Sequence, residues 1–175
     1  AGQNTEERVF RFQAGSANEK KPDTIAAMFQ STEVPVILKR PFVNLAFEFD
    51  GQDSKGVLIT SRGKRLSGNL HWTNTLPSQI SDLEIDLVLA GSTLDQKAIG
   101  VGKGFYRSID NTIIWSSETN RELALVEPGE DGIVSFTFGS TPFKLGSNIR
   151  SPVINLTAHI KGRRLGETGV PETLE

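Results

Sequence analysis

Two histidines, His71 and His159, are the only imidazole groups in the 175-residue sequence and the first candidates for catalysis. Each stands between two apolar residues in a strand-like alternation. Because successive side chains of a strand point to opposite faces, we expect both imidazoles to face solvent. No motif supplies the carboxylates that a metal site or a catalytic triad would need beside them. We therefore expect neither histidine to be catalytic.

Two short motifs resemble parts of enzyme sites. Ser61 and Lys64 have the S-x-x-K spacing of some acyl enzymes, in which a helix turn brings the two side chains together. Here they stand between two expected strands, and Gly63 favours a turn instead. The segment Gly100–Gly104 is as rich in glycine as a phosphate-binding loop, but it lacks the G-x-x-x-x-G-K-[ST] pattern and a following helix. We expect a turn and a connector.

Acidic turns offer a weak calcium site, and calcium is the only cofactor that the sequence leaves open. Calcium takes six to eight oxygen ligands, largely from carboxylates and carbonyls. None of the turns has an EF-hand or another recognised spacing, so each alone is expected to be solvated turn chemistry. Two such loops meeting at one end of a domain could still make a site. The candidate ligands are Asp50, Asp53, Asp110, Glu130 and Asp131.

Aromatic residues could bind a sugar or a peptide. Tyr106 stands next to an expected turn, over Ser108–Thr112, and is the one candidate for an exposed ligand-binding ring. Trp72 alternates with core positions and is expected to be buried. A glycan is therefore a possible ligand through Tyr106.

A Lys–Asn isopeptide bond is the remaining chemical candidate, because a cysteine-free domain can be held together by a cross-link other than a disulfide. Lys39 and Asn155 lie in the first and last strand regions, which is the right topology. Asn155, however, alternates opposite to Ile154 and Leu156 and should face solvent, whereas the reaction needs a buried lysine and amide beside a proton-shuttling carboxyl group. The alternation argues against this bond.

Composition excludes several classes of function. The formal net charge is −2 with no basic stripe, which argues against nucleic acid as a partner. No apolar run approaches the roughly 20 residues of a membrane-spanning helix, and no signal peptide is visible. The absence of cysteine removes disulfides, thiolate catalysis and zinc–thiolate sites.

The elements that would position these residues are short strands of alternating polarity. The segments around Val43–Phe49, Leu70–Asn74, Leu83–Leu89 and Ile133–Phe138 show the pattern most clearly, and Val57–Thr60 is expected to be a further short strand. Turn signals separate about seven to nine such strands, and no helix long enough for a parallel crossover is present. The sequence predicts an all-β fold: an antiparallel Ig-like β-sandwich with an N-terminal strand and linker extension.

We divide the chain into three parts. Residues 1–35 are predicted to be a strand near Arg8–Gln13 followed by a linker, with residues 14–23 having linker composition. This part is either the end of a preceding module or an exchangeable strand, with Val9, Phe10 and Phe12 as its assembly residues. Residues 36–163 form the sandwich, and residues 164–175 are a polar tail or linker.

Four segments in one order carry a resemblance. They are the Trp72–Pro77 segment ending in N-T-L-P, the alternating strand Leu83–Leu89, the stretch Gly104–Trp115 with its polar turn before I-x-W, and Leu125–Phe136 with P-G-E-x-G-x-V-x-F. Together these resemble the Ig-like modules of large, uncharacterised surface proteins of candidate-phylum bacteria. More distantly they are similar to the cell-adhesion-related and conserved-repeat domains of bacterial and archaeal envelopes. The resemblance covers roughly residues 36–170.

The resemblance implies an extracellular or cell-surface module, usually one of several in tandem, and it implies no catalytic residues. We therefore expect a non-enzymatic structural or assembly module, whose partners are tandem modules or neighbouring copies of the same surface protein. It would space or present other domains, and it could assemble by strand exchange through an open sheet edge. The alternative is an adhesive or carbohydrate-binding module assisted by calcium, and an enzyme ranks last.

Overall fold

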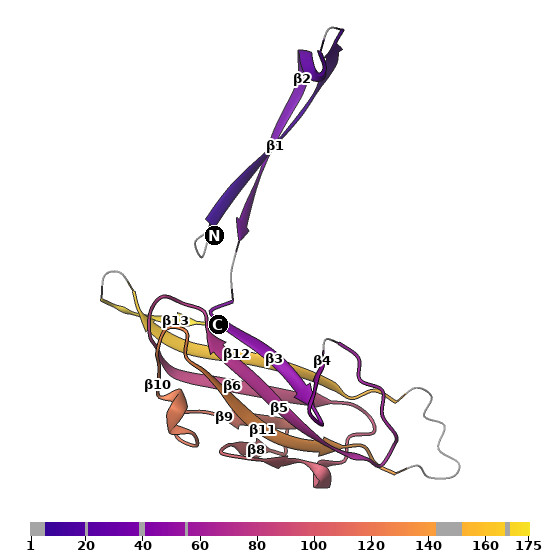
Figure 1. The fold of residues 1–175 in the computed structure, drawn as a ribbon, viewed down its shortest axis with the longest axis vertical. Helices are drawn as coiled ribbons and strands as arrows, with labels where there is room; N and C mark the ends of the chain where they lie inside the picture. Colours follow the sequence, from indigo (N-terminus) through magenta and orange to yellow (C-terminus); the bar gives the residue numbers. More distant parts are fainter. Residues whose placement is uncertain (1–5, 20, 39–40, 55, 143–151, 167–168) are drawn as a thin grey trace. The chain divides into compact units, whose positions relative to one another are not determined.

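The computed structural model describes residues 6–19, 21–38, 41–54, 56–142, 152–166 and 169–175. The chain divides into two compact units, Ala1–Pro41 and Phe42–Glu175, which are described separately below. Figure 1 shows every described strand, and the two sheets of the second unit.

The first unit is a long antiparallel hairpin, here named the N-terminal hairpin. Strand β1 (Glu6–Asn18) pairs with β2 (Lys21–Leu38) from Glu6↔Leu38 to Asn18↔Lys21, with register shifts near its tip. Figure 1 shows it as a twisted ribbon. The expected linker over residues 14–23 is thus the tip of a hairpin. The polar residues of this segment form a ladder because β2, which is rich in apolar and β-branched residues, follows directly and pairs with β1. The composition of residues 14–23 alone does not predict this pairing.

One sheet of the second unit has the order β4-β3-β5-β11-β7, with all pairs antiparallel. The central strand β5 (Arg65–Asn74) pairs with both β3 (Val43–Phe49) and β11 (Asp131–Gly139). The two edges are the short strands β4 (Gln52–Ser54) and β7 (Gly100–Val101). Short edge strands limit the unpaired backbone that a sheet offers to other chains.

The other sheet has the order β13-β12-β6-β9-β8, and β10 also pairs with β6. Its strands are β6 (Ile80–Ala90), β8 (Phe105–Arg107), β9 (Thr112–Trp115), β10 (Leu125–Val126), β12 (Asn155–Leu165) and β13 (Pro171–Leu174). Two 3₁₀ turns, η1 (Gln96–Ala98) and η2 (Arg121–Leu123), lie in the connections.

The apolar core contains inward-facing residues of both sheets. Trp72 of β5 and Trp115 of β9 are its largest fully buried side chains, at 1% and 0% exposure. Leu83, Ile85, Leu87 and Leu89 of β6 are buried as the alternating pattern predicts. The prediction of an all-β antiparallel sandwich is confirmed, as is the core position of Trp72.

Two segments differ from the expectation. The predicted strand at Val57–Thr60 is not a strand, and Val57 and Ile59 are 93% and 92% exposed. A short run of apolar and β-branched residues forms a strand only where a neighbouring strand offers a ladder. Conversely, the expected polar tail contains β13, which pairs with the end of β12. Pro171 is the first residue of this edge strand, a position where proline is tolerated.

Across the described residues, the structure contains no helix of the length and apolarity needed to cross a membrane.

Candidate functional site

The acidic candidates occupy separate turns of the sandwich. Asp50 lies at the β3–β4 turn, and Asp53 lies within β4, opposite Glu48. Asp110 lies between β8 and β9, and Glu130 and Asp131 lie at the start of β11. Within the described ranges, no three His, Cys, Asp or Glu side chains gather closely enough to hold a metal ion. The structure thus gives these carboxylates individual surroundings, which decide what each can do.

Asp50 closes the β3–β4 turn against β5. Its backbone has φ 49°, and its carboxylate accepts hydrogen bonds from Lys64 Nζ at 2.7 Å and from the backbone N–H of Ser67 at 3.1 Å. The hydrogen bond from Lys64 and that from Ser67 lower the pKa of the Asp50 carboxyl group. Lys64, the lysine of the S-x-x-K motif, is therefore ion-paired, and the motif lies in a turn with Gly63 at φ 77°. Ser61 and Lys64 are therefore not on the helix turn that the S-x-x-K motif of acyl enzymes requires.

Asp110 is bound to its neighbour across the β8–β9 turn. Arg107 Nε and Nη2 donate to its two carboxylate oxygens at 2.7 to 3.0 Å. The hydrogen bonds from Arg107 lower the pKa of the Asp110 carboxyl group. This fork-like pair directs the carboxylate along the surface of the turn.

Tyr106 is half-buried on β8 and packs against the core, so it is not the exposed loop ring that the sequence suggested. Its hydroxyl donates to Asn111 Oδ1 at 2.8 Å, and Gln96 Nε2 donates to the same oxygen at 2.7 Å. Asn111 has φ 54°, a conformation that asparagine tolerates better than most residues. Burial raises the pKa of the Tyr106 hydroxyl, and the charge of Asp110 adds to this effect. The ring therefore holds the β8–β9 turn in place.

Glu130 accepts a hydrogen bond from the backbone N–H of Glu127 at 2.7 Å, which closes the turn before β11. Asp131 is the exposed first residue of β11 and pairs with Thr73 of β5. Both residues belong to a turn that is fixed by a neighbouring polar side chain.

Sequence reasoning missed this side chain, Asn74. It is 1% exposed, and its Nδ2 lies 3.0 to 3.2 Å from the carbonyl oxygens of Ser78, Val126 and Glu127. Its Oδ1 accepts from the N–H of Leu76 at 2.9 Å. We name this set the Asn74 network. The sequence does contain a sign of this role. Asn74 stands two residues after Trp72 on the same strand, so it faces the core, and a buried polar side chain needs hydrogen-bond partners.

The histidines face outward as expected. His71 Nε2 lies 3.0 Å from Glu48 Oε2, and the other oxygen of Glu48 accepts from Asn69 Nδ2 at 3.1 Å. His159 is exposed on β12. Asn155 is also exposed, as the alternation requires, while Lys39 lies outside the described residues. The segment Gly100–Gly104 was expected to be a connector, but its first two residues, Gly100 and Val101, form the edge strand β7.

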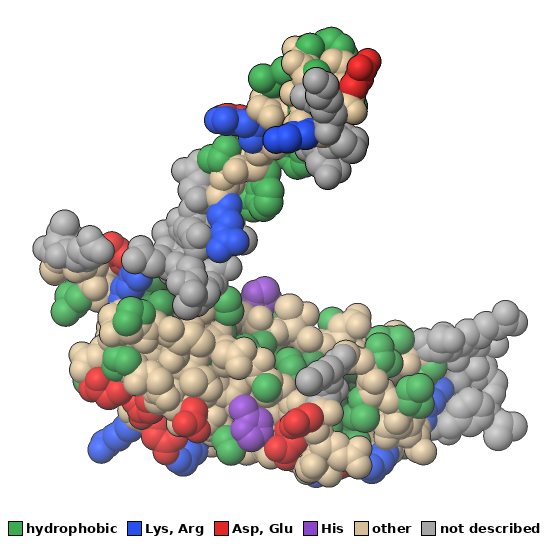
Figure 2. All heavy atoms as spheres, turned by 45° about the horizontal axis from the view of Figure 1, so that its top comes forward, with side chains coloured by type: hydrophobic (Ala, Val, Ile, Leu, Met, Phe, Trp, Pro, Cys, Tyr) green, Lys and Arg blue, Asp and Glu red, His purple; other side chains and the backbone are tan. Residues whose placement is uncertain are grey.

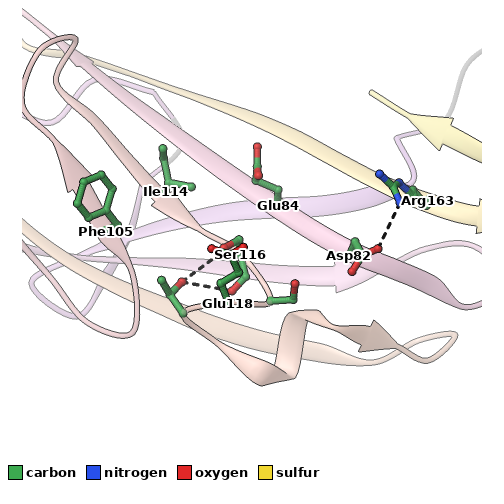
Figure 3. A pocket seen from close by; sticks show the side chains of 9 residues that line it. Asp82, Glu84, Phe105, Ile114, Ser116, Glu118 and Arg163 are labelled. Atoms are coloured by element: carbon green, nitrogen blue, oxygen red, sulfur yellow. Dashed lines mark hydrogen bonds and ion pairs between the residues drawn. The ribbon is translucent and has the colours of Figure 1, made fainter.

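A shallow hollow lies on the outer face of the six-stranded sheet. Figure 3 shows Phe105 and Ile114 at one side, Glu84 between, and the Arg163–Asp82 ion pair (3.7 Å) at the other. Ser116, Ser117, Glu118 and Thr119 complete the lining, and all four come from the turn after β9. Within this turn the N–H of Ser116 donates to Thr119 Oγ1, and that hydroxyl donates to the Ser116 carbonyl, each at 3.2 Å.

Val9, Phe10 and Phe12, proposed from the sequence as assembly residues, lie on β1 of the N-terminal hairpin and are 55%, 50% and 61% exposed. Phe10 and Phe12 share one face of the ribbon, and Val9 lies on the other. Figure 2 shows hydrophobic side chains on the surface of this hairpin.

Comparisons with known proteins give little. No protein-family model matches the chain, and no curated protein matches it. One solved structure to which it is similar is the chitinase ChiA74 from Bacillus thuringiensis, with a TM-score of 0.34 and 13% identity. That match covers 86% of this chain and 20% of the chitinase chain.

Proposed function

We propose that this chain is a non-catalytic structural module of a cell-envelope or surface protein, which spaces or presents neighbouring modules. The support comes from the hydrogen-bonded turns and long ladders of the sandwich, and from the sequence resemblance described above. The extracellular or cell-surface location is carried by that resemblance alone.

The observation that carries the proposal is how the polar turn residues are used. Asp50 is bound by Lys64, Asp110 by Arg107, and Tyr106 by Asn111. Glu130 closes its own turn. Each of these groups makes a bond within its own turn or to a residue beside it, which favours a role in holding the turn. Fixed turns suit a module that transmits position between its neighbours.

The ladders suit the same role. β3, the first strand of the sandwich, pairs with β5 from Val43 to Phe49, and β12 pairs with β6 from Asn155 to Arg163. The partner strands β5 and β6 are consecutive in the chain and belong to different sheets. A load that enters at β3 and leaves past β13 therefore acts on the β3–β5 ladder and, once the short β12–β13 ladder has opened, on the β12–β6 ladder.

Single-molecule force spectroscopy of a polyprotein containing the full chain tests this function. We expect a cooperative unfolding peak whose contour length gain is at most about 48 nm, which is residues 42–175 at about 3.6 Å per residue. Gradual extension without a peak would contradict a load-bearing role. Calcium-dependent melting or a specific hit on a glycan array would favour the adhesive alternative instead.

A further inference from the structure

The N-terminal hairpin is amphipathic. Its register places Phe10 opposite Val34 and Arg11 opposite Glu33, so the two faces of the ribbon differ. One face carries Phe10, Phe12, Val34 and Val36, which are 37% to 61% exposed, with Arg8 at its end opposite Val36. The other carries the Arg11–Glu33 ion pair, in which Arg11 Nε donates to Glu33 Oε1 at 2.7 Å. We name the first of these the apolar face.

A two-stranded ribbon with an exposed apolar face is expected to pack that face against another surface. A two-stranded hairpin is marginally stable in water, and a contiguous exposed apolar face marks a surface that packs against something. β1 and β2 form a sheet of two strands, so the outer edge of β1 is not used in any described ladder. The chain itself contains a second hairpin that shows what such a cover looks like.

That second hairpin, β12–β13, is named the C-terminal hairpin, and its sequence corresponds to that of the first. β13 consists of Pro171-Glu172-Thr173-Leu174, and Pro22-Asp23-Thr24-Ile25 stands near the start of β2. In both hairpins this proline–acid–threonine–aliphatic segment opens the returning strand. Upstream, apolar side chains recur at every second residue in both: Leu156, Ala158 and Ile160 in β12, and Phe10, Phe12 and Ala14 in β1.

The C-terminal hairpin is covered by the sandwich. β12 pairs with β6, and Leu156, Ala158 and Ile160 pack against the core below the sheet. Leu174 at the end of β13 pairs with Gly162 and packs against the same core, whereas Ile25 pairs with Ala17, on the face of β1 opposite to Phe10 and Phe12, and is 42% exposed. The first strands of the two hairpins therefore share an apolar alternation, which packs against the sandwich core in β12 and is exposed in β1.

We propose that the apolar face of the N-terminal hairpin is the docking surface for a second sandwich of the same kind as residues 42–175, which precedes it in a tandem array. In that sandwich β1 takes the place of β12 beside the strand equivalent to β6, and Phe10 and Phe12 take the places of Leu156 and Ala158. The proposal rests on the proposed function, because it names the neighbour that this module is joined to.

The length of β2 adds a geometric consequence. After Ile25 the strand runs on to Leu38, and Leu38 pairs with Glu6 at the start of β1. The returning strand thus leads the chain back along the whole first strand. In a tandem array it leaves the first sandwich at the end where the strand equivalent to β12 begins.

A fused chain tests the proposal. Residues 42–153 are joined directly to residues 8–175, so that Phe10 falls at the place of Leu156 and the added sandwich lacks its own terminal hairpin. A matched fusion of residues 42–175 to residues 8–175 leaves no vacant place. Hydrogen exchange is then measured on both fusions and on the unmodified chain.

We expect the β1 amides to exchange at least 100-fold more slowly in the first fusion than in the unmodified chain or the matched fusion. Replacing Phe10 and Phe12 by serine should remove this protection, while Val9→Ser on the opposite face should keep it. If the matched fusion folds its added sandwich and the first fusion leaves β1 unprotected, the proposal is overturned. It is also overturned if the unmodified chain forms a dimer that F10S/F12S dissociates, because the cover is then a second copy. Neither result depends on the unfolding force, which tests the proposed function separately.

Discussion

The backbone carbonyl of Asn74 accepts a hydrogen bond from the N–H of Gly129 at 3.1 Å, and the N–H of Asn74 donates to the carbonyl of Glu130 at 2.9 Å. Asn74 belongs to the N-T-L-P segment, and Gly129 and Glu130 belong to the P-G-E-x-G segment. The two segments that stand out in the sequence are therefore in direct contact. The side chain of Asn74 joins them further through the carbonyls of Val126 and Glu127.

Asn74→Ala should be strongly destabilising. It removes the Asn74 donor to the buried carbonyl of Val126 and to the part-buried carbonyl of Ser78, and the acceptor for the N–H of Leu76. Each unsatisfied buried group costs about 1–3 kcal/mol, so we expect a loss of roughly 3–5 kcal/mol in urea unfolding. Asn69→Ala, on the outward face of the same strand, is the matched control and should cost about 1 kcal/mol or less. Equal losses in the two variants would contradict a special role for the Asn74 network.

Gly132→Ala should strain the core at Trp72. Gly132 lies opposite Trp72 across the β5–β11 ladder, and an added Cβ would lie 2.4 Å from Trp72 Cζ2. Overpacking of this kind costs about 1–3 kcal/mol, measured as a fall in the free energy of unfolding. Gly102→Ala is the control, because its Cβ would meet only the carbonyl oxygen of Ser135 at 3.7 Å. If the two substitutions melt alike, the indole ring is able to move aside.

The burial of a side chain in the sandwich was predictable where it depends only on the alternation of inward and outward side chains along a strand. The buried residues Leu83, Ile85, Leu87, Leu89 and Trp72 each face inward on a strand that is paired on both sides. β13 and the tip of the N-terminal hairpin were not predictable from composition, because polar residues form strands when a partner strand lies beside them. The prediction of a strand at Val57–Thr60 was wrong because its apolar residues have no partner strand among the residues that the structure describes.

The candidate site was less predictable than the fold. The types of Asp50, Asp110 and Tyr106 suggested ligand binding, but their roles depend on which side chains lie beside them. Lys64 and Asn111, which bind Asp50 and Tyr106, are 14 and 5 residues away in the sequence. No spacing rule for metal or sugar sites contains that information.

Asp50 should contribute to the fall in the free energy of unfolding at acidic pH. Its folded-state pKa lies below the ordinary value of 3.8, so its contribution is complete above that pH and is lost as pH falls through the folded pKa. Lys64→Met removes the larger cause and should move the pKa of Asp50 back toward 3.8. Carboxyl ¹³C NMR titration measures this directly, and an unchanged midpoint would show that Lys64 does not hold the carboxylate in solution.

Tyr106→Phe should cost stability without changing the fold. The hydroxyl loses its bond to Asn111, which is worth about 1 kcal/mol for a typical intramolecular hydrogen bond. Asn111→Ala should cost more, because it removes the acceptor for both Tyr106 and Gln96 and places alanine at φ 54°. Thermal unfolding of the two variants gives the order, and the reverse order would mean that the turn does not depend on Asn111.

Leu174 and Ile25 allow a matched comparison of the two hairpins. Leu174→Ser removes an aliphatic side chain that packs against the sandwich core, and we expect a loss of roughly 1–2 kcal/mol in sandwich stability. Ile25→Ser changes a side chain of the other unit and should leave the sandwich transition within about 0.5 kcal/mol. Denaturant unfolding followed by the fluorescence of Trp72 and Trp115 reports the sandwich alone, since both tryptophans lie in it. If Ile25→Ser lowered that transition as much as Leu174→Ser, the N-terminal hairpin would be covered by this chain's own sandwich.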